Sequence, residues 1–156
     1  MYFIKFSFTS LIQKDIKNGF DYLNRIDEQF TDDLDLKMYK CLLYYFSHEY
    51  TKSKECIASF LRDVKNSKYH ENFIRALKCM MDNKPMKAID NFETCYQIAL
   101  KNGQYDRAIF VLKQLNELYL DCGLQNKLRK VKELQENFYK MSYANQIIED
   151  IELKLN

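Results

Sequence analysis

The chain has 156 residues, of which 47% are hydrophobic and 29% charged, a balance typical of one soluble globular domain. It contains only three glycines and one proline. Sandwiches, Rossmann folds and phosphate-binding loops need glycine for positive φ or close backbone approach, so this composition predicts an all-α protein. The net charge of +2 comes from 24 basic and 22 acidic residues, which disfavours a general nucleic-acid binder.

The first eight residues are apolar except for Lys5 and Ser7. No basic region precedes them and no small-residue cleavage site follows, which disfavours a signal peptide. We expect the first helix of a domain cut from a longer chain. A short strand is the alternative, because apolar and polar residues alternate from Ile4 to Thr9. No stretch approaches the roughly 18 uninterrupted apolar residues that a membrane-spanning helix needs.

Breaks between apolar segments recur at a nearly constant spacing. Four candidate turns are centred on residues 18, 50, 84 and 123, which are 32, 34 and 39 residues apart. A second set is centred on residues 31, 67 and 103, with spacings of 36 and 36. Two interleaved sets of breaks predict helix–turn–helix units in series. We therefore expect residues 1–156 to form one domain, an α-solenoid of about four repeats with eight helices and a short tail.

The segments between these breaks carry the helical period of apolar residues. In 104–122, for example, apolar residues recur at spacings of three and four. Residues 31–33 (Thr-Asp-Asp) predict a helix N-terminus, and Pro85 suits the first turn of another helix. Gly103 and Gly123 stand where a helix is expected to end in the left-handed conformation.

Several motifs in these segments resemble the tetratricopeptide repeat (TPR). Residues 115–119, with Gly123 four residues on, are similar to the first helix of that unit. Residues 88–92 followed by Cys95 are similar to the second helix, and residues 56–60 repeat that spacing. The resemblance covers most of the chain as a degenerate variant. Degenerate Asn-, Lys- and Tyr-rich repeats of this kind are similar to the sensor domains of Gram-positive peptide-pheromone receptors, the Rap, PlcR and arbitrium-receptor group.

Residue types that support catalysis or metal binding are present, but not at the required spacing. The two histidines, His48 and His70, adjoin glutamates outside any HExxH pattern, and no GxSxG occurs. The acids in 32–35 lack the glycine and distal glutamate of a calcium loop. The sequence therefore predicts no enzyme activity, no metal site and no cofactor.

The five cysteines are 15 to 27 residues apart, and none forms a CxxC pair. An odd number of widely spaced cysteines is a poor disulfide framework. We expect small, buried, reduced thiols in a cytoplasmic protein.

Four cations interleaved with two apolar residues form the strongest charge run: Lys127, Arg129, Lys130 and Lys132. A solvated outer helix face is the favoured interpretation, and docking to an acidic partner or nucleic acid is the alternative. The aromatic cluster 44–46 sweeps about 200° around a helix, so at least one ring must face the groove or a neighbour. Tyr45 is the expected one.

The TPR resemblance implies which residues line a groove, because the first helix of each unit lies along the concave surface. Carried onto this chain, the groove-facing positions are Tyr45, His48, Asn72, Arg75, Lys113, Asn116 and Glu117. Asparagines there would clamp a peptide backbone through paired donor and acceptor groups. Arg75 and Lys113 would hold a carboxylate.

The leading hypothesis is a non-catalytic module that holds a short peptide or a partner protein in this groove. The receptor resemblance implies peptide-dependent control of an effector, as in quorum sensing and transcription regulation. The alternative is a structural adaptor or oligomerisation domain that self-associates through its end helices. The last segment carries an apolar stripe that would either cap the solenoid or pair with a second copy in a homodimer. The stripe consists of Ile147, Ile148, Ile151 and Leu155.

Overall fold

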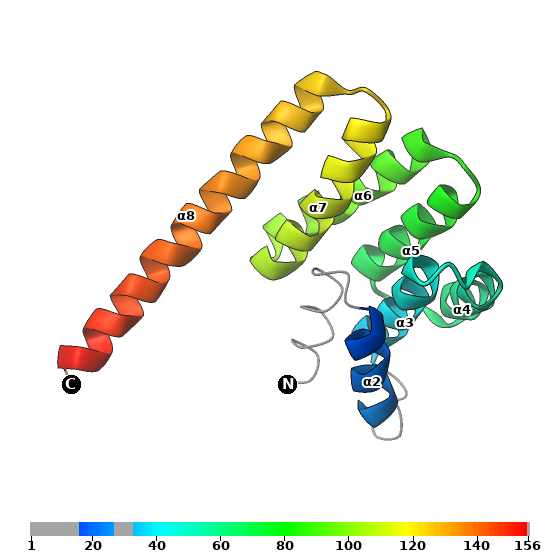
Figure 1. Cartoon of the computed structure of the whole chain (residues 1–156), viewed down its shortest axis with the longest axis horizontal. Coiled ribbons are helices and arrows are strands. Elements are labelled where there is room, and N and C mark those ends of the chain that lie inside the picture. The colour runs from blue at the N-terminus through cyan, green and yellow to red at the C-terminus, as the bar shows by residue number, and fades with distance from the viewer. Residues whose placement is uncertain (1–15, 27–32, 156) are drawn as a thin grey trace.

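The computed structural model describes residues 16–26 and 33–155, and within them all side chains except those of residues 22, 24–26 and 142–155. Seven α-helices occupy these residues, with no β-strand among them (Figure 1). The prediction of an all-α class is confirmed. In chain order the helices are α2 (Ile16–Ile26), α3 (Leu34–Phe46), α4 (Tyr50–Asp63), α5 (Lys68–Met81), α6 (Pro85–Lys101), α7 (Tyr105–Asp121) and α8 (Gln125–Leu155).

Each of these helices packs against its neighbour in the chain. From α3 onward the connecting loops have three or four residues, and such short loops join helices into antiparallel pairs. Figure 1 shows this arrangement for α5, α6 and α7. Helix α3 also contacts α5, so these two alternate helices lie side by side.

A continuous apolar core runs through the helices, with Phe73 of α5 at its centre. The Phe73 ring meets the ring of Phe92 edge-on at 5.1 Å and stacks on the ring of Phe110 at 5.6 Å. Phe73, Phe92 and Phe110 are all fully buried. Because burying one phenylalanine contributes about 1.5–3 kcal/mol, this cluster holds α5, α6 and α7 together.

Most of the predicted helix ends are confirmed. Asp33 precedes α3, and its carboxylate accepts hydrogen bonds of 2.8 and 3.2 Å from two backbone N–H groups of the first turn. Pro85 is the first residue of α6. Gly103 and Gly123 follow α6 and α7 with φ of 66° and 67°. The breaks expected at residues 67, 84, 103 and 123 therefore coincide with real loops.

Two predicted breaks are misplaced. The turn expected at residue 18 is wrong, because residues 17–19 lie inside α2. Gly19 serves packing: a Cβ built there would lie 2.6 Å from Cδ2 of Leu43, so the missing side chain lets α2 approach α3 closely. The turn expected at residue 50 lies at 47–49 instead, and Tyr50 begins α4. The break expected at residue 31 and the N-terminal helix or strand lie outside the described residues.

Helix α8 runs without interruption for 31 residues. The segment from residue 144 to Leu155 is therefore continuous with the helix that begins at Gln125. Figure 1 shows that it extends beyond the end of α7. The side chains of the predicted stripe (Ile147, Ile148, Ile151 and Leu155) are outside the described set.

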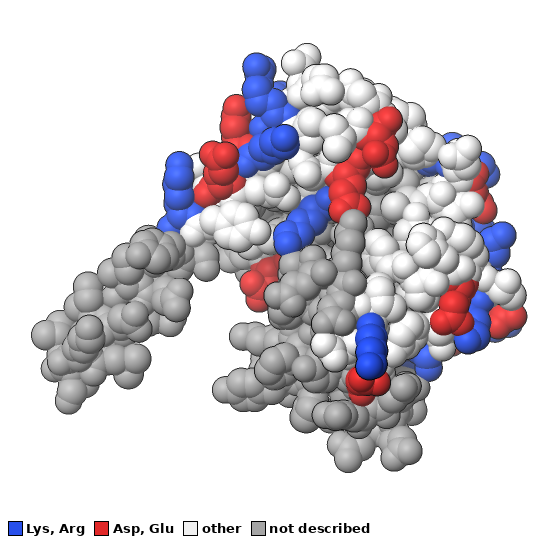
Figure 2. All heavy atoms as spheres, viewed as in Figure 1, with Lys and Arg blue, Asp and Glu red and all other residues white. Residues whose placement is uncertain are grey.

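The surface carries both signs of charge. Figure 2 shows basic and acidic side chains alternating over the first half of α8, with no face of a single sign in this view. Arg129 and Lys132 of the predicted charge run are exposed. None of the described helices combines the length and the hydropathy that crossing a bilayer requires.

Candidate functional site

A cavity of about 390 Å³ lies where the C-terminal ends of α3 and α7 meet the start of α4. We refer to it as the α3–α7 cavity. Its wall combines aromatic and apolar side chains with two carboxylates: Ile16, Tyr45, Phe46, His48, Tyr50, Met80, Glu117, Leu118 and Asp121. It joins segments that are about 70 residues apart in the chain.

Aromatic rings form one side of the α3–α7 cavity. The ring of Tyr45 lies 5.5 Å from that of Phe46 and 5.9 Å from that of Tyr50. His48 meets Tyr50 edge-on at 5.7 Å, and its Nδ1 lies 2.8 Å from the Tyr50 hydroxyl. These contacts orient the rings before any ligand binds.

His48 adopts an unusual backbone conformation. It has φ of 61°, and its N–H donates to the carbonyl oxygen of Tyr45 at 3.1 Å just after the end of α3. Glycine or asparagine usually occupies such a left-handed position after a helix, and asparagine does so after α5, at Asn83. A histidine at this point therefore costs local stability, which suggests that its ring is needed there.

Two acids of α7 form the opposite side. Asp121 is the last residue of α7, Glu117 lies one helical turn before it, and both are exposed. A carboxylate in the last turn of a helix, here that of Asp121, faces the negative end of the helix dipole, which destabilises it by about 0.3–1 kcal/mol. Burial raises the pKa of Tyr45, and the nearby Tyr50, Glu117 and Asp121 raise it further, so these acids impose a negative potential on the aromatic wall.

The cavity therefore suits a cation. Aromatic faces attract cations through their quadrupole, and the two carboxylates add a direct charge attraction. A lysine, an arginine or an N-terminal amine of a partner chain has the required chemistry.

Three of the seven predicted groove residues line the α3–α7 cavity: Tyr45, His48 and Glu117. The other four do not. Asn72 donates to the Lys68 carbonyl oxygen at 2.7 Å, and Arg75 forms an ion pair with Glu71 at 2.9 Å, so both are engaged within α5. Lys113 is half-buried on α7.

Asn116 differs from these three residues because its side-chain oxygen is buried and has no hydrogen-bond partner in the structure. Buried acceptors are normally satisfied, and this oxygen has essentially no accessible surface, so a ligand does not reach it in this arrangement. It lies next to Glu117 in the sequence but does not line the α3–α7 cavity.

Sequence reasoning missed Tyr50 and Asp121. Both carried a signal: Asp121 lies four residues after Glu117, hence on the same helix face, and Tyr50 follows the aromatic cluster 44–46. Within that cluster Tyr45 and Phe46 line the cavity, whereas Tyr44 packs against Phe20 at 5.2 Å.

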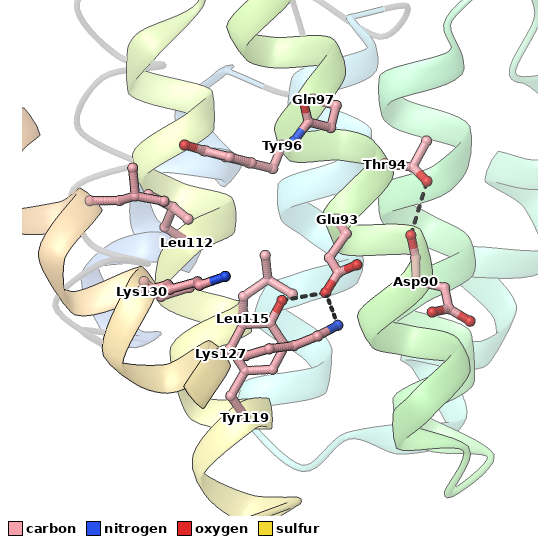
Figure 3. Close-up of a pocket in the computed structure, with 12 residues that line it drawn as sticks. Asp90, Glu93, Thr94, Tyr96, Gln97, Leu112, Leu115, Tyr119, Lys127 and Lys130 are labelled. Carbon is pink, nitrogen blue, oxygen red and sulfur yellow. Dashed lines mark hydrogen bonds and ion pairs between the residues drawn. The ribbon is translucent and has the colours of Figure 1, made fainter. Parts of the chain in front are cut away.

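A second cavity, of about 590 Å³, lies between α6 and α8 with α7 as its floor (Figure 3). Buried Leu112, Leu115 and Val131 line it. The Tyr119 hydroxyl donates to Oε1 of Glu93 at 2.5 Å, and Nζ of Lys127 lies 2.6 Å from the same atom (Figure 3).

This network engages part of the predicted cation run. Burial alone would raise the pKa of Glu93, but the hydrogen bonds from Lys127 and Tyr119 and the charge of Lys127 lower it below its usual value. Lys127 is thus bound to Glu93, and Lys130 also lines this α6–α8 cavity. Its mixture of paired charges indicates no single class of ligand.

A polar network joins the N-terminal ends of α3, α5 and α7. His70 Nε2 lies 2.8 Å from Asp35 Oδ1, and Arg107 donates to Asp35 Oδ2 at 2.6 Å. The Arg107 guanidinium also lies over the Tyr69 ring at 5.0 Å, and Ser67 Oγ lies 2.5 Å from His70 Nδ1. His70 thus forms hydrogen bonds through both ring nitrogens near the start of α5.

Hydrogen bonds connect Ser67 to His70 and His70 to Asp35, as in the Ser–His–Asp triad of hydrolases. The surroundings of these three residues instead indicate a structural role. Only 5% of His70 is exposed, and none of the three residues lines either cavity described above. Burial would raise the pKa of Asp35, yet the hydrogen bond from His70 and the charge of Arg107 lower it overall. The carboxylate is thus an anchor for three helices.

Among the described residues, no group of three or more His, Cys, Asp or Glu side chains is arranged to hold a metal ion. Comparison with models of known protein families, with curated proteins and with solved structures gives no match. Function therefore has to be inferred from the geometry of these sites.

Proposed function

We propose that this chain is a non-catalytic binding module that holds a short peptide or a segment of a partner protein. In this proposal the helix hairpins form a TPR-like solenoid, and the ligand lies along its concave side with one basic group in the α3–α7 cavity. The observation that supports it best is the pairing of Glu117 and Asp121 with the rings of Tyr45 and Tyr50 around one cavity.

Two unfavourable local features meet at this cavity. His48 has a left-handed backbone, and Asp121 lies at the wrong end of the α7 helix dipole. Proteins tend to break local stability rules where function requires it. Both features become useful if a cation binds between them, because it would compensate the acids and stack on the aromatic rings.

The free energy needed to bind such a peptide is modest. Micromolar affinity corresponds to about −8 kcal/mol. One desolvated cation–π contact contributes about 2 kcal/mol, and a few backbone hydrogen bonds supply further binding energy. A peptide of a few residues with a lysine or arginine anchor would suffice.

The proposal revises the chemistry expected from sequence. Arg75 and Lys113 were expected to hold a carboxylate, but Arg75 is paired with Glu71, and the acids of the cavity favour the opposite charge. A cytoplasmic, peptide-responsive regulator remains the biological role we propose, in which ligand occupancy shifts the population of helix arrangements.

The test uses the full chain and an array of short random peptides. Bound peptides should be enriched in lysine or arginine, and the double variant Glu117→Gln/Asp121→Asn should bind the best of them at least tenfold more weakly. The matched control is Asp106→Asn, an exposed acid at the other end of α7. Enrichment of acidic peptides, or equal binding by the double variant, would refute the proposal.

Self-association through the end of α8 is the alternative, supported by the continuation of that helix beyond α7. Sedimentation at several concentrations separates the two ideas. An obligate dimer that binds no peptide would favour the adaptor role.

A further inference from the structure

Two cysteines face one another across the hairpin of α3 and α4. Cys41 lies six residues before the turn at 47–49, and Cys56 lies seven residues after it, so the two are at nearly the same distance from the turn. Because the helices are antiparallel neighbours, this symmetry brings the residues to the same level. The two side chains are neighbours, because both border one small cavity and hydrogen bonding with Cys56 raises the pKa of the Cys41 thiol.

The pair is accessible from one side. Both cysteines line a small cavity of about 160 Å³ on the hairpin. Cys41 is only 1% exposed, whereas Cys56 is half-buried, so a reagent reaches Cys56 first. Lys37, Lys40 and Asp63 border the same cavity, so its rim carries both signs of charge.

The two thiols have different chemical roles. The hydrogen bond to Cys56, together with burial, raises the pKa of the Cys41 thiol. Cys41 is therefore the less reactive thiol, and Cys56, which is half-buried, is the one that a reagent reaches. Because the thiolate is the nucleophile in disulfide exchange, Cys56 is the attacking residue and Cys41 the resolving one.

We propose that Cys41 and Cys56 form a reversible intramolecular disulfide when the chain meets a small anionic disulfide such as glutathione disulfide. The Cys56 thiolate attacks one sulfur of glutathione disulfide, which forms a mixed disulfide and releases one glutathione thiolate. Cys41 then loses its proton, attacks the Cys56 sulfur and releases the second glutathione. Two protein thiols are oxidised by two electrons, and the two protons end on two glutathione thiols.

The disulfide would close a ring that contains Tyr45, His48 and Tyr50. Oxidation would thus restrain the aromatic wall of the α3–α7 cavity and the turn that carries it. The proposal does not depend on what that cavity binds, because its evidence is the position of the two thiols on the α3–α4 hairpin and at one small cavity.

The test is to incubate the reduced full chain with glutathione disulfide, count free thiols and map disulfides by mass spectrometry. We expect the thiol count to fall from five to three, with one intramolecular bond between Cys41 and Cys56 and no retained glutathione. Reducing agent should restore five thiols, and the oxidised chain should melt at a higher temperature because the bond restricts the unfolded chain.

Two variants test the order of steps. In Cys41→Ser, Cys56 has no resolving partner, so glutathione should stay attached to it. In Cys56→Ser, Cys41 should remain reduced because it is buried. The half-buried Cys79 is the comparison thiol within the same sample. A stable mixed disulfide at Cys56 of the unaltered chain, or oxidation at Cys79 or Cys122 while the pair stays reduced, would overturn the proposal.

Discussion

The N-terminal ends of α3 and α7 differ from their C-terminal ends in what surrounds their acidic side chains. At the N-terminal ends, Asp35 of α3 is bound by His70 and by Arg107 of α7, and the charges are matched and partly buried. At the C-terminal ends, Glu117 and Asp121 border a cavity of about 390 Å³ walled by aromatic rings. The same pair of helices is thus tied by an ion network at one end and left concave at the other.

We infer from this difference that the N-terminal ends of the two helices stabilise the fold and that the C-terminal ends bind a ligand. A carboxylate with two strong donors stabilises the fold but has little left to offer a ligand. Exposed acids next to aromatic rings at the edge of a cavity can bind a cation. Changes at the first end should therefore alter unfolding, and changes at the second should alter binding.

Removing the ion network should have the largest effect on stability. Asp35→Ala leaves Arg107 and His70 without their shared acceptor in a partly buried setting, and we expect a loss of about 2 kcal/mol in the free energy of unfolding. Urea denaturation measures it. The control Asp90→Ala removes an exposed acid of α6 and should cost less than about 0.5 kcal/mol. Equal losses in the two variants would contradict the structural role of Asp35.

Low pH should reduce the contribution of Asp35 to the free energy of unfolding. The pKa of Asp35 is lower in the folded chain than its ordinary value of 3.8, so the unfolded chain takes up a proton first as pH falls. The contribution of Asp35 is then fully present above about pH 5 and is lost as pH falls through 3.8 and below the folded pKa. The stability gap between the unaltered chain and Asp35→Asn should therefore shrink over this range. A gap that stays constant from pH 6 to pH 3 would show that the carboxylate charge is irrelevant.

The strained histidine at the open end should give the smallest change, and one of opposite sign. His48→Gly removes the cost of a side chain at φ of 61°, and we expect a gain of about 0.5 kcal/mol in unfolding free energy together with weaker peptide binding. Asn83→Gly is the matched control: it follows α5 at φ of 55° and lies outside the cavity, so binding should not change. Weaker binding in both variants would argue against a role for the His48 ring.

Local features of the fold were predictable, because helix ends depend on nearby residues. Asp33, Pro85, Gly103 and Gly123 act through their own backbone or side-chain chemistry, and each ends or begins a helix where expected. The turn expected at residue 18 was wrong because glycine also occurs where two helices pack closely. Gly19 does so against Leu43, and that contact depends on how α2 meets α3.

The candidate site was only partly predictable for a related reason. The TPR resemblance implied that Tyr45, His48 and Glu117 face a groove, but not that α3 and α7 approach one another past α5. That approach depends on the angles at which successive hairpins pack, as seen in the contact of Asp35 with Arg107 across 72 residues. No local pattern encodes such an angle.

The length of α8 has a mechanical consequence. Its 31 residues correspond to about 46 Å at 1.5 Å per residue, whereas α7, the helix it packs against, has only 17. The outer part of α8 is then a lever about 20 Å long, and a tilt of about 10° at its base displaces the tip by about 3.5 Å. A small repacking of α8 against α7 would thus be amplified into a movement large enough for another molecule to sense.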